Sequence, residues 1–240
     1  AFALKDGLRE KFTIVTKCNI VLTGERRPNH KMHMYNTSKE YILKAVEHSL
    51  HDLKISTLDV LLIHRVDPLM DPAEVAETFA ELKSCGKVKY FGVSNFSPRL
   101  FDTLEAALAP HNIHLVCNQV EISLKHLDAL TDGTLDQCLQ LSVAPMAWSP
   151  FGGGAIFTDQ DEHNSKIRDA LQTVAAQHGN VSIDATMLAW LMRHPAKICP
   201  IIGSSKVERI APSVAACAVK LTREEWFTIY VAARNGVDVP

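Results

Sequence analysis

The 240-residue sequence predicts an α/β protein built on a parallel sheet, and two observations carry this prediction. Residues 60–63 (VLLI) form an unbroken apolar run before His64, a pattern typical of a strand buried on both faces of a parallel sheet. Comparable runs end near residues 16, 63, 93, 120, 147 and 202, with helical patterns between them. Several intervals are close to the ~30 residues of a strand–helix–strand unit, so we expect parallel strands joined by helical crossovers.

The individual strands are predicted from apolar or β-branched runs with polar boundaries. We expect strands at residues 12–16, 58–63, 90–93, 115–120, 143–147 and 198–202. Among the early helices, Thr37 with Glu40 predicts a capping box that opens a helix to about residue 53. Asp71 followed by Pro72 predicts the start of another helix, which runs to about residue 84.

The later helices follow similar start signals. Ser97-Pro98 predicts a helix to about residue 108, and Thr222 with Glu225 predicts a capped final helix to about residue 234. Further helical patterns cover residues 1–11, 134–141, 165–177 and 183–193, and one follows 203–205 to about 218. The polar connection over residues 18–36 is long enough to be a functional loop over a site.

A (β/α)8 TIM barrel fits this pattern better than a Rossmann sheet, because no G-x-G-x-x-G follows any strand. Such a barrel usually takes ~250 residues and eight strands, whereas the sequence predicts six. Six strands alone would leave an open parallel edge at each end of the sheet. We therefore expect one barrel domain over residues 1–240 with strands 3–8 present and the first two βα units missing from the chain.

Composition argues against several classes of partner. The net charge of −2 gives no reason to expect nucleic acid or an anionic membrane surface, and no apolar run approaches the ~20 residues of a membrane span. The six scattered cysteines, without a C-x-x-C pair, predict reduced, mostly buried thiols of a cytoplasmic protein. His30 and His33 lie three apart but lack further ligands nearby, so we expect no metal. The oligomeric state is not visible in the sequence.

Polar or aromatic side chains follow each predicted strand at its C-terminal end, where barrels place their catalytic groups. They are Lys17, His64, Ser94-Asn95, Asn118-Gln119, Trp148-Ser149 and Gly203-Ser204-Ser205. Lys17 and His64 can carry or perturb a proton, the Ser, Asn and Gln side chains suit a neutral amide, and Trp148 offers a flat face to a ring. The last segment, with Lys206 and Arg209, predicts a phosphate site at a helix N-terminus. An amide, a ring and a phosphate together describe a nicotinamide dinucleotide.

Each of these residues also has an ordinary structural explanation. His64 could be a buried histidine satisfied by a neighbour, Lys17 a salt-bridged lysine, and Trp148 a core residue. Residues 152–154 could be a plain flexible loop, and the cations at 206 and 209 a solvated helix face. The convergence of six such sets on the ends of six strands favours the functional interpretation.

Seven short segments resemble motifs of the aldo-keto reductases, and the resemblance covers essentially the whole chain. The segments are 15–17 (VTK), 61–64 (LLIH), 86–88 (GKV), 91–96 (FGVSNF), 118–121 (NQVE), 148–150 (WSP) and 200–205 (PIIGSS). Residues 67–71 (DPLMD) and the glycine-rich loop are most similar to a bacterial oxidoreductase branch of that family. The resemblance implies NADPH-dependent reduction of aldehyde or ketone carbonyls to alcohols on a (β/α)8 barrel.

The resemblance also implies roles for individual residues. Lys17 matches the lysine that lowers the pKa of a proton-donating tyrosine, and His64 matches the histidine that orients the carbonyl. The implied cofactor-binding residues are Ser94, Asn95, Gln119, Trp148, Ser149, Pro150, Phe151, Gly152, Gly203, Ser204, Ser205, Lys206 and Arg209. The family's aspartate and tyrosine would fall before Ala1, and the four tyrosines of the chain lie outside the matching motif. We therefore expect the chain as given to lack its general acid and to be inactive.

Two other functions remain open at this point. The barrel could hold a nicotinamide nucleotide as a regulatory or structural module without turnover, or Lys17 could be the Schiff-base lysine of a barrel aldolase. The nicotinamide-like set of residues disfavours the aldolase. A preference for NADPH over NADH would depend on Lys206 and Arg209, and the physiological substrate would depend on loops at 19–36 and 152–165.

Overall fold

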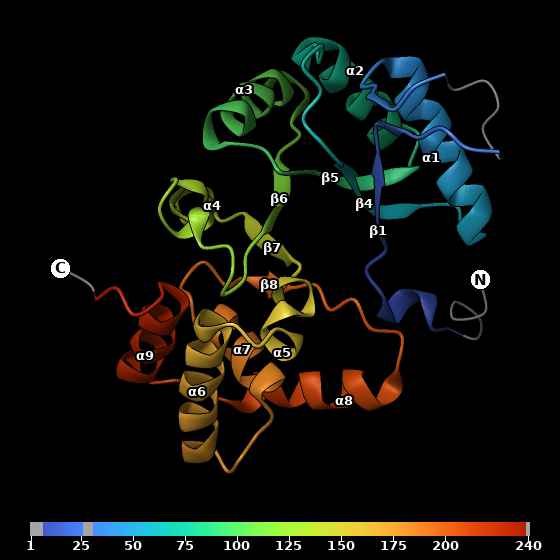
Figure 1. Cartoon of the computed structure of the whole chain (residues 1–240). Helices are drawn as coiled ribbons and strands as arrows, with labels where there is room; N and C mark the ends of the chain where they lie inside the picture. The colour runs from blue at the N-terminus through green and yellow to red at the C-terminus, as the bar shows by residue number, and fades with distance from the viewer. Residues whose placement is uncertain (1–6, 26–30, 239–240) are drawn as a thin grey trace. The chain divides into compact units, whose positions relative to one another are not determined.

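The computed structural model describes residues 7–25 and 31–238 (Figure 1). The chain forms two compact units, Ala1–Asn118 and Gln119–Pro240. The expected helix over residues 1–11 lies partly outside the described residues, and inside them only Arg9–Lys11 forms a single 3-10 turn. Each unit contains parallel strands and helices, as the alternation in the sequence predicts.

The first unit is a parallel sheet with helices packed beside it. Its strands are β1 (Val15–Cys18), β4 (Leu58–Ile63) and β5 (Val88–Ser94), followed by β6 (Leu115–Glu121), which continues into the second unit. All six residues of β4 are buried, which explains why the sequence shows a continuous apolar run here rather than alternation. A small antiparallel pair, β2 (Ile20–Val21) and β3 (Met34–Tyr35), interrupts the connection that we expected to be a loop.

Three helices of this unit pack side by side, as Figure 1 shows. They are α1 (Lys39–Leu53), α2 (Pro72–Ser84) and α3 (Pro98–Leu108), with a 3-10 turn at Ala109–His111. The starts of α2 and α3 are those predicted, since Asp71 Oδ1 accepts the Ala73 N–H and Ser97 Oγ accepts the Leu100 N–H.

The capping box predicted at Thr37 is wrong by one residue. Ser38 is the N-cap of α1, and its hydroxyl oxygen accepts the N–H of Tyr41. The Thr37 hydroxyl instead donates to Oδ2 of Asp67 at 2.9 Å, and the Thr37 N–H donates to the same oxygen at 3.0 Å. Thr37 was predicted to cap the helix from the local sequence pattern. Its hydroxyl instead satisfies the buried carboxylate of Asp67, which is distant in the sequence.

The second unit contains β7 (Ala144–Trp148) and β8 (Cys199–Pro200), which follow β6 in the order of the sheet. Its helices are α4 (Thr134–Leu141), α5 (Ala155–Thr158), α6 (Glu162–Gln177), α7 (Ile183–Met192), α8 (Val207–Ala215) and α9 (Arg223–Ala233). Three 3-10 turns, Asp128–Leu130, Gly152–Gly154 and Ala216–Ala218, lie between them. The Thr222–Glu225 capping box at the start of α9 is confirmed.

Strand β8 is shorter than the predicted 198–202, although the expected total of six strands is confirmed in the sheet of the described residues. Pro200 has no N–H to donate, so the ladder weakens there. The Ile201 N–H still donates to the carbonyl of Ala147 at 2.8 Å, which keeps the following segment beside β7.

The core of the second unit joins α7 to α9 through two tryptophans. Trp190 is 1% exposed and stacks on Trp226, with ring centroids 4.9 Å apart. Each indole N–H donates to the backbone carbonyl of the other residue at 3.1 Å. Both polar atoms are therefore satisfied within the stack, which buried indoles require.

The cysteines and histidines correct part of the sequence analysis. The six thiols are free, but three of them are exposed, so the expectation that they are mostly buried is wrong for half of them: Cys85, Cys199 and Cys217. His30 lies outside the described residues, while the His33 ring lies 3.0 Å from the hydroxyl of Thr23. Within the described ranges, no group of three potential metal ligands occurs and no helix is long and apolar enough to cross a membrane.

Candidate functional site

In the first unit, adjacent strands bring Lys17 and His64 to the same edge of the sheet. Lys17 lies on β1, paired with Leu62 of β4, and His64 is the first residue after β4. The His64 N–H donates to the carbonyl of Cys18 at 3.1 Å and to Oδ1 of Asn19 at 3.0 Å. Asn19, with a positive φ of 79°, also donates from Nδ2 to the carbonyl of Arg65 at 2.8 Å. This buried asparagine therefore fixes the backbone from which His64 projects.

The surroundings at this edge of the sheet lower the pKa of both Lys17 and His64. Burial lowers the pKa of Lys17 below its ordinary value of 10.5. The pKa of His64 is lowered below 6.5, first by burial and then by the positive charges of Lys17 and Arg65. A neutral imidazole can donate one hydrogen bond and accept another, which suits a residue that orients a polar substrate.

Ser94 and Asn95 join this group from the end of β5. Asn95 Nδ2 donates to the Ser94 hydroxyl at 2.9 Å and to the carbonyl of His64 at 3.4 Å. Asn95 has a positive φ of 60°, a conformation that asparagine tolerates better than most residues. Asn118, at the end of the unit, donates from Nδ2 to the carbonyl of Phe96 at 2.9 Å. Its buried Oδ1 has no hydrogen-bond partner among the described residues.

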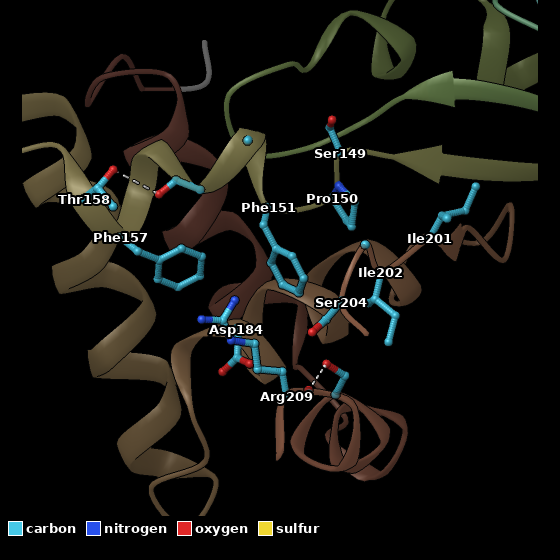
Figure 2. A pocket seen from close by; sticks show the side chains of 14 residues that line it. Ser149, Pro150, Phe151, Phe157, Thr158, Asp184, Ile201, Ile202, Ser204 and Arg209 are labelled. Carbon is cyan, nitrogen blue, oxygen red and sulfur yellow. Dashed lines mark hydrogen bonds between the residues drawn. The ribbon is translucent and has the colours of Figure 1, made fainter. Parts of the chain in front are cut away.

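The second unit contains a cavity of about 740 Å³ (Figure 2). It is formed by the segments after β7 and β8, together with residues of α5, α7 and α8. Six of the predicted cofactor-binding residues line it: Ser149, Pro150, Phe151, Gly203, Ser204 and Arg209. The two segments that the sequence assigned to a dinucleotide, 148–152 and 203–209, therefore contribute to one cavity.

Five other predicted residues of this unit do not line the cavity: Gln119, Trp148, Gly152, Ser205 and Lys206. Gln119 is buried, Trp148 is half-buried, and Ser205 and Lys206 are exposed. Lys206 is the N-cap residue of α8, and its N–H donates to the Ser204 hydroxyl at 3.1 Å. A Cβ at Gly152 would lie 2.9 Å from Cγ of Lys125, so this glycine is explained by a close approach rather than by a ligand.

The backbone around the cavity is unusual at several positions. Ser149 has a φ of 50°, and Gly153 and Gly154 have φ values of 67° and 90°. These left-handed conformations turn the chain from β7 into the short helix α5, where Phe157 meets Phe151 at 6.1 Å between ring centroids. A Cβ at Gly203 would contact nothing within 4 Å, so the backbone there is open to a close ligand.

These residues fit the adenosine-phosphate end of a dinucleotide. Arg209 supplies a cation, Ser204 and Ser213 supply hydroxyls, and Phe151 with Ile202 supplies apolar surface. A volume of about 740 Å³ is within the range of small-molecule sites. Phosphate groups favour such a combination of guanidinium, hydroxyl and accessible backbone.

Four polar or aromatic lining residues were missed by the sequence analysis: Phe157, Thr158, Asp184 and Ser213. Ser213 lies four residues after Arg209 on α8, so helical spacing could have placed the two on one face. Phe157 and Thr158 lie on α5, whose four residues are too few to give a periodic signal. Asp184 is in the first turn of α7, where acidic residues are common for reasons of helix stability alone.

Comparison with known proteins places the chain in a family. The Aldo/keto reductase family matches residues 1–232. The chain is 48% identical over its full length to the uncharacterized oxidoreductase YcsN of Bacillus subtilis, and covers 79% of that protein. It is 46% identical over its full length to the oxidoreductase YdhF of Escherichia coli, of which it covers 78%. The chain therefore belongs to the aldo-keto reductase family, whose members are oxidoreductases that use nicotinamide dinucleotides.

Two further matches give a named activity and a solved structure. A 6-dehydroglucose reductase of Agrobacterium fabrum is 41% identical over 95% of this chain, which covers 74% of that enzyme. A thermostable aldo-keto reductase, Tm1743, solved with the inhibitor epalrestat, superposes with a TM-score of 0.78 and 30% identity. That match covers 96% of this chain and 75% of the other, and agrees with an α/β fold of the TIM-barrel kind.

The same comparisons bear on the expected N-terminal truncation. The family match begins at residue 1, and the YcsN and YdhF matches extend over all 240 residues. The expectation that the first two βα units are missing from the chain is therefore not supported by the comparisons.

Proposed function

We propose that the protein reduces aldehyde or ketone carbonyls to alcohols with NADPH as the cofactor. The observation that carries this proposal is the cavity of the second unit, because two segments predicted to bind one dinucleotide both line it. Arg209 is the residue we assign to the adenosine phosphate, with Ser204 beside it in the lining. The dinucleotide, when bound, would supply the hydride for the reduction.

Lys17 and His64 are the residues we assign to the carbonyl chemistry. This assignment is supported by the pKa of His64, which is lowered in part by the positive charge of Lys17. A neutral His64 would hold the carbonyl oxygen by a hydrogen bond, and the Lys17 ammonium would stabilise negative charge that develops on an oxygen nearby. Ser94 and Asn95, which already form a hydrogen-bonded group with His64, would bind a carboxamide.

Reduction of a carbonyl also needs a proton donor, and the four tyrosines of the chain are the residues to consider for this role. Tyr41 donates its hydroxyl to the carbonyl of Ile20, and Tyr230 packs on Trp226, so neither is suited to proton donation at Lys17. Tyr35 and Tyr90 are exposed and lie outside the matching motifs. We therefore propose that the 240 residues alone turn over about 10²–10⁴ times more slowly than an enzyme with a positioned acid.

The relatives suggest a first substrate to test. Because a relative at 41% identity is named a 6-dehydroglucose reductase, we include sugar aldehydes of this kind among the candidate substrates.

Free cysteines and a small-molecule substrate support a cytoplasmic location.

The proposal is tested by measuring nucleotide binding and turnover separately. NADPH should quench the tryptophan fluorescence of the wild type, and Arg209→Gln should weaken binding by about tenfold, as expected for the loss of a charged phosphate contact. Slow NADPH oxidation with a sugar aldehyde, abolished in His64→Ala, would support a reductase. NADPH binding without any turnover would favour the non-catalytic module, and the absence of binding would contradict both functions.

A further inference from the structure

The cavity of the second unit contains a carboxylate as well as a guanidinium. Asp184 of α7 and Arg209 of α8 both line it, and Figure 2 draws their side chains in the same part of the cavity, below the Phe151 ring. Among residues 7–25 and 31–238, neither side chain forms an ion pair or a hydrogen bond with another residue. Two opposite charges are therefore available to a ligand in the same cavity.

Helix stability accounts for only part of this arrangement. An acidic residue in the first turn of α7 interacts favourably with the helix dipole. The start of α7 is already capped, however, because the Ser182 hydroxyl oxygen accepts the N–H of Ala185. A dipole effect would operate equally well with the carboxylate directed to solvent, and it does not explain why Asp184 lines the cavity.

We propose that Asp184 acts together with Arg209 to set how strongly the protein discriminates between a ribose 2′-phosphate and a ribose 2′-hydroxyl. This inference rests on the proposed function, because it assumes that the cavity holds the adenosine end of a dinucleotide. Asp184 repels the phosphate and accepts a hydrogen bond from the hydroxyl, whereas Arg209 attracts the phosphate. The protein should consequently bind NADH as well as NADPH.

The charges around the cavity give this balance its direction. A 2′-phosphate carries up to two negative charges, so one carboxylate in the cavity weakens its binding, while a ribose hydroxyl is a good donor to a carboxylate. The sequence assigned two cations, Lys206 and Arg209, to the phosphate, but only Arg209 lines the cavity. The preference for the 2′-phosphate should therefore be weaker than two cations would give, because the cavity contains the cation Arg209 and the opposing carboxylate Asp184.

The chain offers a matched control in Glu208. It precedes Arg209 on α8, is exposed, and does not line the cavity. Asp184→Asn and Glu208→Gln each remove one negative charge near Arg209, but only the first removes a carboxylate from the cavity. A difference between them separates a direct contact from the general field of the surface.

The test uses adenosine 2′,5′-bisphosphate and 5′-AMP as probes, because they differ only in the 2′-phosphate and need no turnover. Their dissociation constants are measured by calorimetry on the wild type, Asp184→Asn, Glu208→Gln and Arg209→Gln. We expect Asp184→Asn to raise the affinity ratio of bisphosphate to monophosphate by about three- to tenfold, and Arg209→Gln to lower it by a similar factor. Glu208→Gln should change the ratio by less than about twofold.

Three results would overturn the inference. If both probes bind but Asp184→Asn leaves the ratio unchanged, Asp184 has no role in discrimination, and the proposed function is unaffected. If Glu208→Gln changes the ratio as much as Asp184→Asn, the effect belongs to the general field. If neither probe nor NADPH binds the wild type, the proposed function fails and the inference fails with it. Asp184→Ser, measured alongside, serves if the asparagine variant does not fold.

Discussion

At the scale of single residues, the lowered pKa of His64 has several causes, and mutation can separate the two largest. Burial is the larger cause and the positive charge of Lys17 is the next. Replacing Lys17 by Met removes the charge but leaves the ring buried, so the pKa of His64 should rise without returning to 6.5. Titration of the His64 ring signals by NMR measures this shift. Lys44→Met, which removes an exposed lysine of α1, should leave the titration of His64 unchanged.

The same shift has a consequence for stability. A histidine whose pKa is lower in the folded state than in the unfolded state binds fewer protons when folded, so acid favours unfolding. The contribution of His64 should be lost progressively as the pH falls from about 6.5 through its lowered pKa. Lys17→Met narrows this interval, and the free energy of unfolding should then depend less on pH within it. An unchanged pH dependence in that variant would show that the charge of Lys17 is not felt at His64.

At the scale of elements, substitution by alanine should affect the free energy of unfolding differently at two glycines, one within a strand and one in the segment that follows a strand. Gly92 lies in β5 opposite Leu62, and a Cβ there would lie 2.6 Å from Sγ of Cys117 and 2.8 Å from Cδ2 of Leu62. Gly92→Ala should therefore lower the free energy of unfolding by about 1–3 kcal/mol, as overpacking of a sheet does. Gly203→Ala meets no atom within 4 Å and should change stability by less than about 0.5 kcal/mol.

The two variants should also differ in nucleotide binding. Gly203 lines the cavity, so its added methyl group would occupy space that we assign to the dinucleotide, whereas a methyl group at Gly92 would meet the buried side chains of Leu62 and Cys117. Urea unfolding and NADPH titration of both variants give the four values needed. If Gly203→Ala loses stability, or if it binds NADPH with unaltered affinity, then the backbone at Gly203 is not open to a close ligand as proposed.

The elements also show what the sequence could and could not predict. Strands such as β4 and caps such as Thr222–Glu225 were predictable because their signals are local. The cap of α1 was misplaced because Thr37 is held by Asp67, a long-range contact that no local pattern contains. The cavity residues at strand ends were found by topology, since parallel strands end at a common edge. Asp184 was not, because its helix position has a sufficient local explanation.

At the scale of the whole molecule, the single barrel domain predicted from the sequence is still a prediction, and the positions of the tryptophans allow a direct test. The three tryptophans are Trp148, Trp190 and Trp226, all in the second unit. Intrinsic fluorescence therefore reports the unfolding of that unit, while far-ultraviolet circular dichroism reports helices of both. If the chain is one cooperative domain, the two signals should give the same urea midpoint.

Asp59 provides the perturbation for this test, because it is buried in the first unit. Its carboxylate accepts the Ile14 N–H at 2.8 Å and pairs with Arg9 and Lys89 at 2.8 Å each. Burial alone would raise the pKa of Asp59, but the Ile14 hydrogen bond and the two cations outweigh it, so the pKa is lowered. Asp59→Ala should lower the free energy of unfolding by about 2–4 kcal/mol at neutral pH. This loss is smaller than that expected for a fully buried ion pair, because Lys89 is exposed.

In a single cooperative domain, this loss in the first unit must also appear in the fluorescence of the second. Asp59→Ala should shift the fluorescence midpoint and the circular dichroism midpoint to lower urea by equal amounts, because neither unit can stay folded without the other. Asp52→Ala, at a carboxylate that is 79% exposed, should shift neither. A fluorescence transition left in place while the dichroism becomes biphasic would show two separately folding units. The two compact units would then be domains in the thermodynamic sense, and the prediction of one barrel domain would be wrong.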